Sequence, residues 1–233
     1  MTIWLRLRAP FAAFRWMQAG VYRATSPVIP PSAAWGLVLN LAGVETRGED
    51  DGTTTQVRDD APALCLAIGA VRQAEVGSVY QQLHGYPVGS SFPELEAKAR
   101  GTKYGILPVR REVLVGFDCV LGVRAADESL LERVALGLRG ELGQPRYGLP
   151  FAGDNNLLFD RIDVEPTPTA ARWYSPLAED ETERRSGSCR LTVAIDRRDA
   201  SRTETRLFAP GSGSQALPPE SAWVWVPRAP VSV

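Results

Sequence analysis

Residues 30–43 read PPSAAWGLVLNLAG, a nearly unbroken apolar run that begins with two prolines. The prolines stop the segment before them, and Ser32 is a candidate cap for the first free amides of a helix over 33–44. Asn40 is the only polar side chain in that expected helix. A helix that is apolar on nearly all sides must be covered on nearly all sides. We therefore expect it in the core, with Trp35 buried.

A half-buried strand is expected before this helix. Positions 3, 5 and 7 are aliphatic, whereas Trp4, Arg6 and Arg8 occupy the positions between them, and successive side chains of a strand point to opposite faces. Residues 11–23 then interleave aromatic side chains with Arg15 and Arg23. This composition suits stacking on bases and pairing with phosphates, and it would equally suit an ordinary hydrophobic loop.

Further strands and a second helix are expected after residue 60. The segments 63–72, 76–88, 111–124 and 157–164 are apolar or alternating and predict strands. Residues 128–143, ESLLERVALGLRGELG, predict an amphipathic helix that ends at Gly143. The order strand, helix, strand, strand, helix, strand is the ferredoxin-like order of RNA-recognition domains. The predicted fold class is therefore α+β, with a ferredoxin-like (RRM-like) βαββαβ domain.

Two additions to this domain are expected. Residues 89–105 are glycine-bounded, cationic and irregular, and indicate an insertion that projects from the domain. Residues 166–233 contain proline-rich turns and strand candidates at 190–197, 204–209 and 222–227. We place the main domain at 1–165, with its insertion near 86–108, and a small β-rich C-terminal appendage at 166–233.

Charge is distributed unevenly along the chain. The formal net charge of -1 would by itself argue against a nucleic-acid ligand. Residues 97–111, however, hold five basic side chains and no acid. Of the 26 basic residues only Lys98 and Lys103 are lysine, a bias that favours bidentate phosphate contacts and that genomic base composition also produces. Folding could thus place one basic face on a near-neutral protein.

Cysteine usage and hydropathy exclude several classes of protein. Cys65, Cys119 and Cys189 are far apart and odd in number, so neither a disulfide framework nor a zinc site is expected. No apolar run has the length of a signal peptide or a membrane span, so we expect a cytoplasmic protein without membrane contact. The loop GLPFAGDNN at 148–156 suggests turn chemistry but lacks the Lys-Ser or Lys-Thr of a phosphate-binding loop, so nucleotide hydrolysis is not expected.

Four stretches, in this order, resemble the Cas-five (Cas5) subunits of type I CRISPR Cascade complexes, which belong to the RAMP superfamily. The first joins the initial strand to PFAAFR (10–15) and VIPPSAAWGLVLNLAGVE (28–45), and the others are YQQLHGYP (80–87), PVRREVLVG (108–116) and YGLPFAGDNNLLFDRI (147–162). The resemblance implies the same fold with a thumb between the second and third strands. It also implies a subunit that binds the 5′ handle of a CRISPR RNA (crRNA) and caps one end of the complex. The implied partners are the Cascade backbone subunit, the large subunit and, through the assembled complex, target DNA.

The candidate RNA-binding residues come from the N-terminal loop, the segment around the only histidine, the insertion and a double arginine. They are Arg15, Arg23, Tyr80, Gln82, His84, Arg100, Lys103, Tyr104, Arg110 and Arg111. No acid lies near Arg15 or Arg23 in the sequence to compete with phosphate. Because neighbours on a strand face opposite ways, we expect one residue of the Arg110–Arg111 pair to meet RNA and the other a neighbour or a carboxylate. Ordinary solvated or salt-bridged arginines are the alternative for these positions.

His84 raises the question of catalysis. Metal-free RNA cleavage needs a base for the 2′-hydroxyl proton and an acid or cation for the leaving oxygen, and one Cas5 relative processes precursor crRNA with Tyr, Lys and His. The YQQLHGYP context resembles the non-cleaving relatives more closely, so we expect no catalytic residue, no metal and no cofactor. Two alternatives stay open: a metal-independent endoribonuclease that processes precursor crRNA, and a protein-only scaffold subunit.

Overall fold

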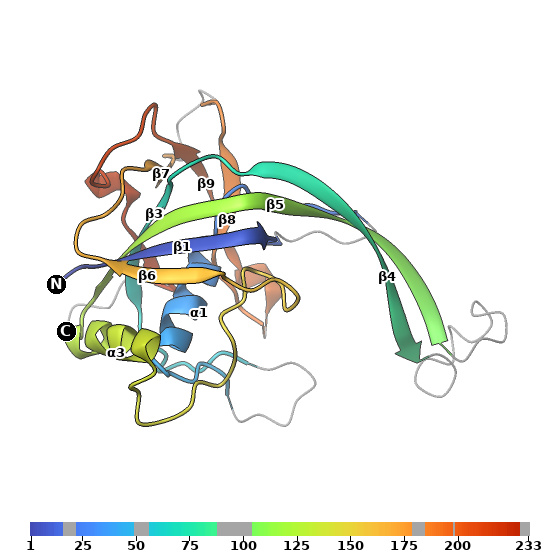
Figure 1. Cartoon of the computed structure of the whole chain (residues 1–233), viewed down its shortest axis with the longest axis horizontal. Coiled ribbons are helices and arrows are strands. Elements are labelled where there is room, and N and C mark those ends of the chain that lie inside the picture. Colours follow the sequence, from blue (N-terminus) through green and yellow to red (C-terminus); the bar gives the residue numbers. More distant parts are fainter. Residues whose placement is uncertain (16–21, 49–55, 88–103, 179–184, 198, 229–233) are drawn as a thin grey trace.

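A computed structural model describes residues 1–15, 22–48, 56–87, 104–178, 185–197 and 199–228, with only the backbone described at 83–87, 104–107 and 200. Within these residues the chain is mostly β: ten strands form one sheet, and two α-helices pack against it (Figure 1). The fold is therefore α+β. None of the helices in these ranges is long and apolar enough to cross a membrane.

Four strands and the two helices form the centre of the fold. In chain order these elements are β1 (Ile3–Ala12), α1 (Pro31–Leu41), β3 (Leu64–Ala70), β5 (Tyr104–Ala125), α3 (Glu128–Arg139) and β6 (Arg161–Glu165). The four strands lie side by side in the order β6-β1-β5-β3, and every neighbouring pair is antiparallel. This arrangement is consistent with the predicted βαββαβ domain.

The C-terminal strands extend the same sheet. Beyond β3 lie β7 (Arg172–Pro176), β9 (Glu204–Pro210) and β8 (Cys189–Ala194), while β10 (Val224–Val226) pairs with the other end of β3. Short 3-10 helices, η2 (Ala200–Arg202) and η3 (Glu220–Ala222), connect them. Three of these strands fall at the predicted positions, and the division into 1–165 and 166–233 stays a prediction.

A two-stranded ribbon extends from the body of the molecule and curves away from it (Figure 1). It consists of β4 (Glu75–Pro87) paired with residues 104–115 of β5. The two-residue strand β2 (Tyr22–Arg23) runs parallel to β5 on the opposite edge. The sequence predicted one or two strands over 111–124, and the structure has a single strand of 22 residues that starts at Tyr104. Most of the predicted insertion near 86–108 lies outside the described residues.

The helices pack where the sequence predicts, but two of their ends were wrongly assigned. Trp35 of α1 is only 8% exposed, and its indole nitrogen donates to the Pro62 carbonyl at 2.8 Å. The predicted Ser32 cap is wrong: the cap position is Pro30, and no side chain bonds there, because proline at the start of a helix needs no amide partner. Helix α3 ends at Arg139 and is capped by Gly140, which has a φ of 75°, and not by Gly143. A left-handed residue directly after a helix is commonly glycine.

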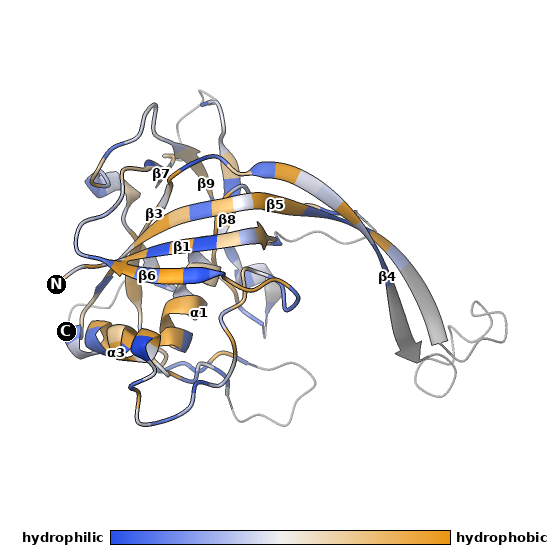
Figure 2. Cartoon of the chain, viewed as in Figure 1, coloured by the Kyte–Doolittle hydropathy of each residue, from blue (hydrophilic) through white to orange (hydrophobic). Residues whose placement is uncertain are grey.

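Two apolar clusters hold the sheet between them. The larger one joins the helices to the sheet, and Figure 2 shows α1 as an almost continuously apolar element within it. Each fully buried leucine stabilises the folded state by about 1.5–3 kcal/mol. At Gly137 a Cβ would lie 1.8 Å from the Leu41 carbonyl oxygen, so glycine lets α3 approach α1. On the other face of the sheet, Trp4 and Trp223 close over Gly122, where a Cβ would lie 2.5 Å from the Trp4 ring.

Candidate nucleic-acid interface

A row of exposed side chains crosses the ribbon where β2 and β4 flank β5. Arg110 lies opposite Tyr22 of β2 and opposite Tyr80 of β4. Residues in direct register on neighbouring strands project from the same face of a sheet. Tyr22 is 48% exposed, Tyr80 is 66% exposed, and Arg110 is also exposed. We call these three residues the tyrosine–arginine row.

The row has one fixed neighbour, Glu112, which follows Arg110 by two positions and so shares its face. The Tyr22 hydroxyl donates to Glu112 Oε1 at 2.7 Å, and the Thr25 amide donates to Oε2 at 3.0 Å. The hydrogen bond to Glu112 raises the pKa of Tyr22 above its ordinary value. Within the described residues, Arg110 has neither a hydrogen bond nor an ion pair. Its five donors thus face solvent.

Arginines also gather on the opposite face of the ribbon, around one carboxylate. Arg111 is 5% exposed, and its Nη1 lies 2.5 Å from Asp154 Oδ2. Arg15 reaches the same oxygen at 3.5 Å, and half-buried Arg23 is in register with Arg111. The buried Nε of Arg111 has no partner among the described atoms. Among the described residues, this face therefore combines the guanidinium groups of Arg15, Arg23 and Arg111 with the Asp154 carboxylate.

The loop at 148–156 positions Asp154 beneath the ribbon. Gly153 has a φ of 86°, and a Cβ there would lie 2.3 Å from the Ala13 carbonyl oxygen, so this close approach requires glycine. Burial raises the pKa of Asp154, but hydrogen bonds from Asn156 and the charges of Arg111 and Arg15 outweigh it and bring the pKa below its ordinary value. The Asp154 carboxylate is therefore ionised at neutral pH and holds Arg111 in place.

The geometric prediction for the double arginine is confirmed. Arg110 faces solvent, and Arg111 points the other way and binds a carboxylate. No acid near Arg15 in the sequence competes for it, but Asp154, which is 139 positions away, reaches it in the fold. The Arg15 side chain nevertheless stays 55% exposed.

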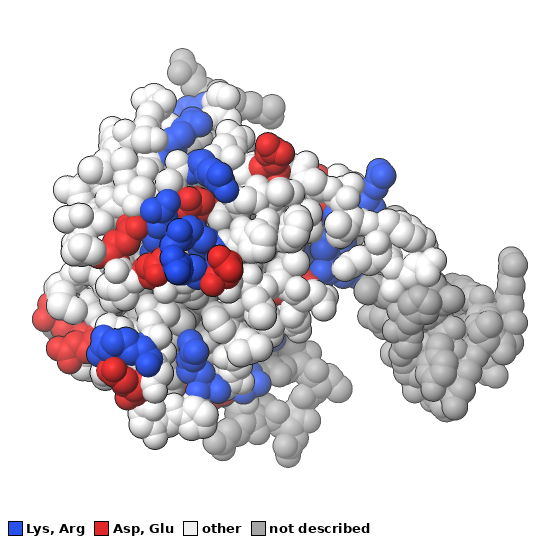
Figure 3. Space-filling model, in the orientation of Figure 1, with Lys and Arg blue, Asp and Glu red and all other residues white. Residues whose placement is uncertain are grey.

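The first arginines of the chain do not contribute to this cationic region. Arg6 Nε lies 3.0 Å from Asp118, and Arg8 Nη2 lies 2.6 Å from Asp163. Figure 3 shows the result as blue and red side chains mixed over β1 and β6, with further blue groups at the base of the ribbon. Strand alternation placed these two arginines on the correct face, but their acidic partners come from β5 and β6.

Three other predicted residues, Gln82, His84 and Tyr104, lie on the ribbon beyond the tyrosine–arginine row. Gln82 is exposed and in register with Pro108. The backbone of His84 pairs with Ile106, and that of Tyr104 pairs with Pro87. The side chains of His84 and Tyr104 lie outside what the structure describes, as do Arg100 and Lys103 entirely. Their roles stay predictions.

Tyr22 and Glu112 were absent from the predicted site. The interleaving of aromatic and basic residues over 11–23 was the available signal for Tyr22. Glu112 had no signal, because an acid next to two arginines in the sequence is expected to neutralise them. The structure shows that it instead binds a tyrosine hydroxyl and a backbone amide on the face of the row.

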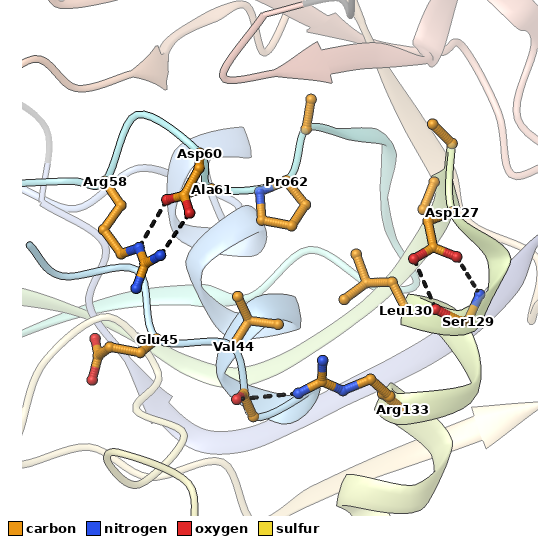
Figure 4. Close-up of a pocket in the computed structure, with 14 residues that line it drawn as sticks. Val44, Glu45, Arg58, Asp60, Ala61, Pro62, Asp127, Ser129, Leu130 and Arg133 are labelled. Atoms are coloured by element: carbon orange, nitrogen blue, oxygen red, sulfur yellow. Dashed lines mark hydrogen bonds and ion pairs between the residues drawn. The ribbon is translucent and has the colours of Figure 1, made fainter.

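A hollow of about 510 Å³ offers no comparable chemistry (Figure 4). It lies between the end of α1, residues 58–63 and the start of α3. Its charged groups already have partners: Arg58 pairs with Asp60, Glu45 pairs with Arg47, and Arg133 donates to the Gly43 carbonyl at 3.4 Å. Among the described residues no cluster of His, Cys, Asp or Glu could hold a metal ion. The ribbon is therefore the better candidate site.

Comparisons with known proteins agree with this fold and point to one family. Residues 2–139, more than half of the chain, match the model of a family described as CRISPR-associated protein (Cas_Cas5). A chain of a "CRISPR RNA-guided surveillance complex" superposes with a TM-score of 0.59 at 13% identity, over 92% of this chain and 90% of that chain. A "Crystal structure of Cas protein" superposes with a TM-score of 0.52 at 15% identity, over 91% and 94%. At these identities the structural likeness concerns the fold alone. No curated protein matches the sequence.

Proposed function

We propose, because this chain belongs to the CRISPR-associated Cas5 family, that it is a non-catalytic RNA-binding subunit of a CRISPR surveillance complex and holds the 5′ handle of the crRNA. It would cap one end of a Cascade assembly. There it would contact the backbone subunit and the large subunit, and it would meet target DNA through the assembled complex. The proposal includes the finer fold assignment, a ferredoxin-like domain with a thumb near 86–108.

The observation that supports RNA binding is the exposed guanidinium of Arg110, which has no hydrogen bond or ion pair among the described residues and lies between two exposed tyrosines. Single-stranded RNA is bound by aromatic rings that stack on splayed bases and by arginines that pair with phosphates. On the opposite face, Arg15 and Arg23 would pair with phosphates. Arg111 is already bound to Asp154 and would act through its buried positive charge. Gln82 and His84 would contact handle bases, and Arg100, Lys103 and Tyr104 would contact the RNA backbone.

The proposal is tested by removing Arg110 alone, because its side chain supports no other described group. We expect Arg110→Ala to weaken binding of handle RNA and to reduce the slope of log K against log salt by about one, the value for one lost phosphate contact. Arg139→Ala is the matched control, since Arg139 is exposed on α3 and pairs with Glu141. Unchanged affinity and an unchanged slope for Arg110→Ala would count against the assignment.

The non-catalytic part of the proposal needs its own experiment. Purified protein is incubated with repeat RNA in the absence of metal, alongside the His84→Ala variant. We expect intact RNA in both samples. Cleavage at one position that disappears in His84→Ala would replace this proposal with the endoribonuclease alternative. A protein-only scaffold would instead give no crosslink between the handle and residues 15–23 or 80–111 in the assembled complex.

A further inference from the structure

An acidic side chain lies on the same exposed face as the tyrosine–arginine row. Arg110 and Glu112 are next-but-one neighbours on β5, so their attachment points are about 7 Å apart. The Tyr22 ring spans this interval, because Tyr22 is in register with Arg110 while its hydroxyl binds Glu112. A base stacked on Tyr22 would therefore lie within reach of both the guanidinium and the carboxylate.

The carboxylate of Glu112 is held in place and retains free acceptor capacity. Oε1 accepts a hydrogen bond from the Tyr22 hydroxyl at 2.7 Å, and Oε2 accepts one from the Thr25 amide at 3.0 Å. Each oxygen of a carboxylate has two lone pairs, so one acceptor site on each oxygen remains. No arginine or lysine binds Glu112 in the described part of the chain. The group is thus a fixed anion that lacks a cation.

A fixed anion on a phosphate-binding face repels the RNA backbone and instead fits the donor groups of a base. Cytosine, adenine and guanine present an exocyclic amino group, and Glu or Asp can accept a hydrogen bond from it. Uracil presents a carbonyl oxygen in place of the amino group of cytosine. A carboxylate opposite that oxygen would bring two acceptors together, which is unfavourable.

We propose that Glu112 is a specificity-determining residue, which selects a base with an exocyclic amino group over uracil at the nucleotide that stacks on Tyr22. This inference rests on the proposed function, because it requires single-stranded RNA on this face of the ribbon. Arg110 contributes affinity by pairing with the adjacent phosphate. Tyr22 contributes both a stacking surface and the hydroxyl that orients the carboxylate.

The test compares two pyrimidine oligonucleotides whose bases differ at this amino position and at the adjacent ring nitrogen. Fluorescence anisotropy of the full-length protein is measured with labelled octacytidylate and octauridylate at one salt concentration. We expect the wild type to bind octacytidylate roughly tenfold more tightly, the lower range of discrimination by one base-edge contact. In Glu112→Gln the amide can donate as well as accept, so the ratio should fall to about one.

Three further variants separate selection from folding and from general charge. Tyr22→Phe keeps the ring but removes the hydroxyl that orients Glu112, so it should lower the ratio while both oligonucleotides still bind. Glu141→Gln removes an exposed carboxylate just after the end of α3 and should leave the ratio unchanged. Should Glu112→Gln fail to fold, Glu112→Asp withdraws the carboxylate by one methylene and should also reduce the ratio.

The possible outcomes separate this inference from the function on which it rests. A wild type that binds both oligonucleotides equally, or a preference that survives in Glu112→Gln and Glu112→Asp, overturns the role of Glu112 and leaves RNA binding intact. A wild type that binds neither oligonucleotide nor handle RNA overturns the proposed function itself. A tenfold preference that disappears in Glu112→Gln and persists in Glu141→Gln supports the inference.

Discussion

Replacing Asp154 by alanine should strongly destabilise the protein, because it leaves Arg111 buried without its counter-ion. The two side chains are 6% and 7% exposed, so water cannot replace the lost carboxylate. Breaking a buried ion pair by removing one partner costs about 3–5 kcal/mol. The total stability of a domain is commonly about 5–15 kcal/mol, so the variant should lose a large fraction of it.

Equilibrium unfolding in urea, followed by tryptophan fluorescence, measures this loss. Glu141→Ala is the matched control, because it breaks an exposed pair with Arg139 and should cost less than about 1 kcal/mol. The double variant Arg111→Met, Asp154→Leu should recover most of the stability, since an apolar pair leaves no buried charge. If Asp154→Ala lost no more free energy than Glu141→Ala, the ion pair would not be the element that anchors the ribbon to the loop at 148–156.

Three other predictions concern the core, the same carboxylate and the thiols. Gly137→Ala should lower the melting temperature, because the added Cβ would lie 1.8 Å from the Leu41 carbonyl oxygen. A Cβ added at Gly36 would meet no neighbouring element within 4 Å, so Gly36→Ala should be neutral or stabilising. Equal melting temperatures for the two variants would refute this packing. The pKa of Asp154 is depressed below its ordinary 3.8 in the folded state, so the stability that its charge contributes is complete above that value and is lost as the pH falls through the folded pKa. In Asp154→Asn the free energy of unfolding should therefore fall less steeply at acid pH than in the wild type. Parallel plots of unfolding free energy against pH would contradict this prediction. Burial raises the pKa of the Cys65 and Cys119 thiols and brings that of Cys189 to about 12. Because the thiolate is the reactive form, iodoacetamide at pH 8 should label all three cysteines only after unfolding. Rapid labelling of the native protein would show that one of the thiols is accessible.

Much of the fold is encoded in local periodicity and could be predicted. Alternation in residues 3–8 assigns the faces of β1, and the apolar run at 30–43 identifies the buried helix. The same rule for neighbouring strand residues separated Arg110 from Arg111. Each of these inferences uses only the geometry of one element.

The remaining features depend on contacts between distant parts of the chain. Arg15 and Asp154 are 139 positions apart, and no pattern in either segment indicates that they meet. Strand β2 has only two residues, too few for a periodic signal, and it exists because β5 offers it a free edge. The end of α3 at Arg139 was missed because two glycines, Gly140 and Gly143, follow the apolar stripe within four residues, and either could cap the helix.

The length of β5 limits how this protein can vary in evolution. One uninterrupted strand carries Arg110 and Arg111 in the ribbon and also Leu121 in the centre of the core. An insertion or deletion of one residue between these points would exchange the faces of every side chain on one side of it. It would turn Arg111 toward solvent or a core leucine outward. We therefore expect relatives to tolerate changes in length beyond the ribbon tip and to keep the count of residues from Arg110 to Leu121 constant.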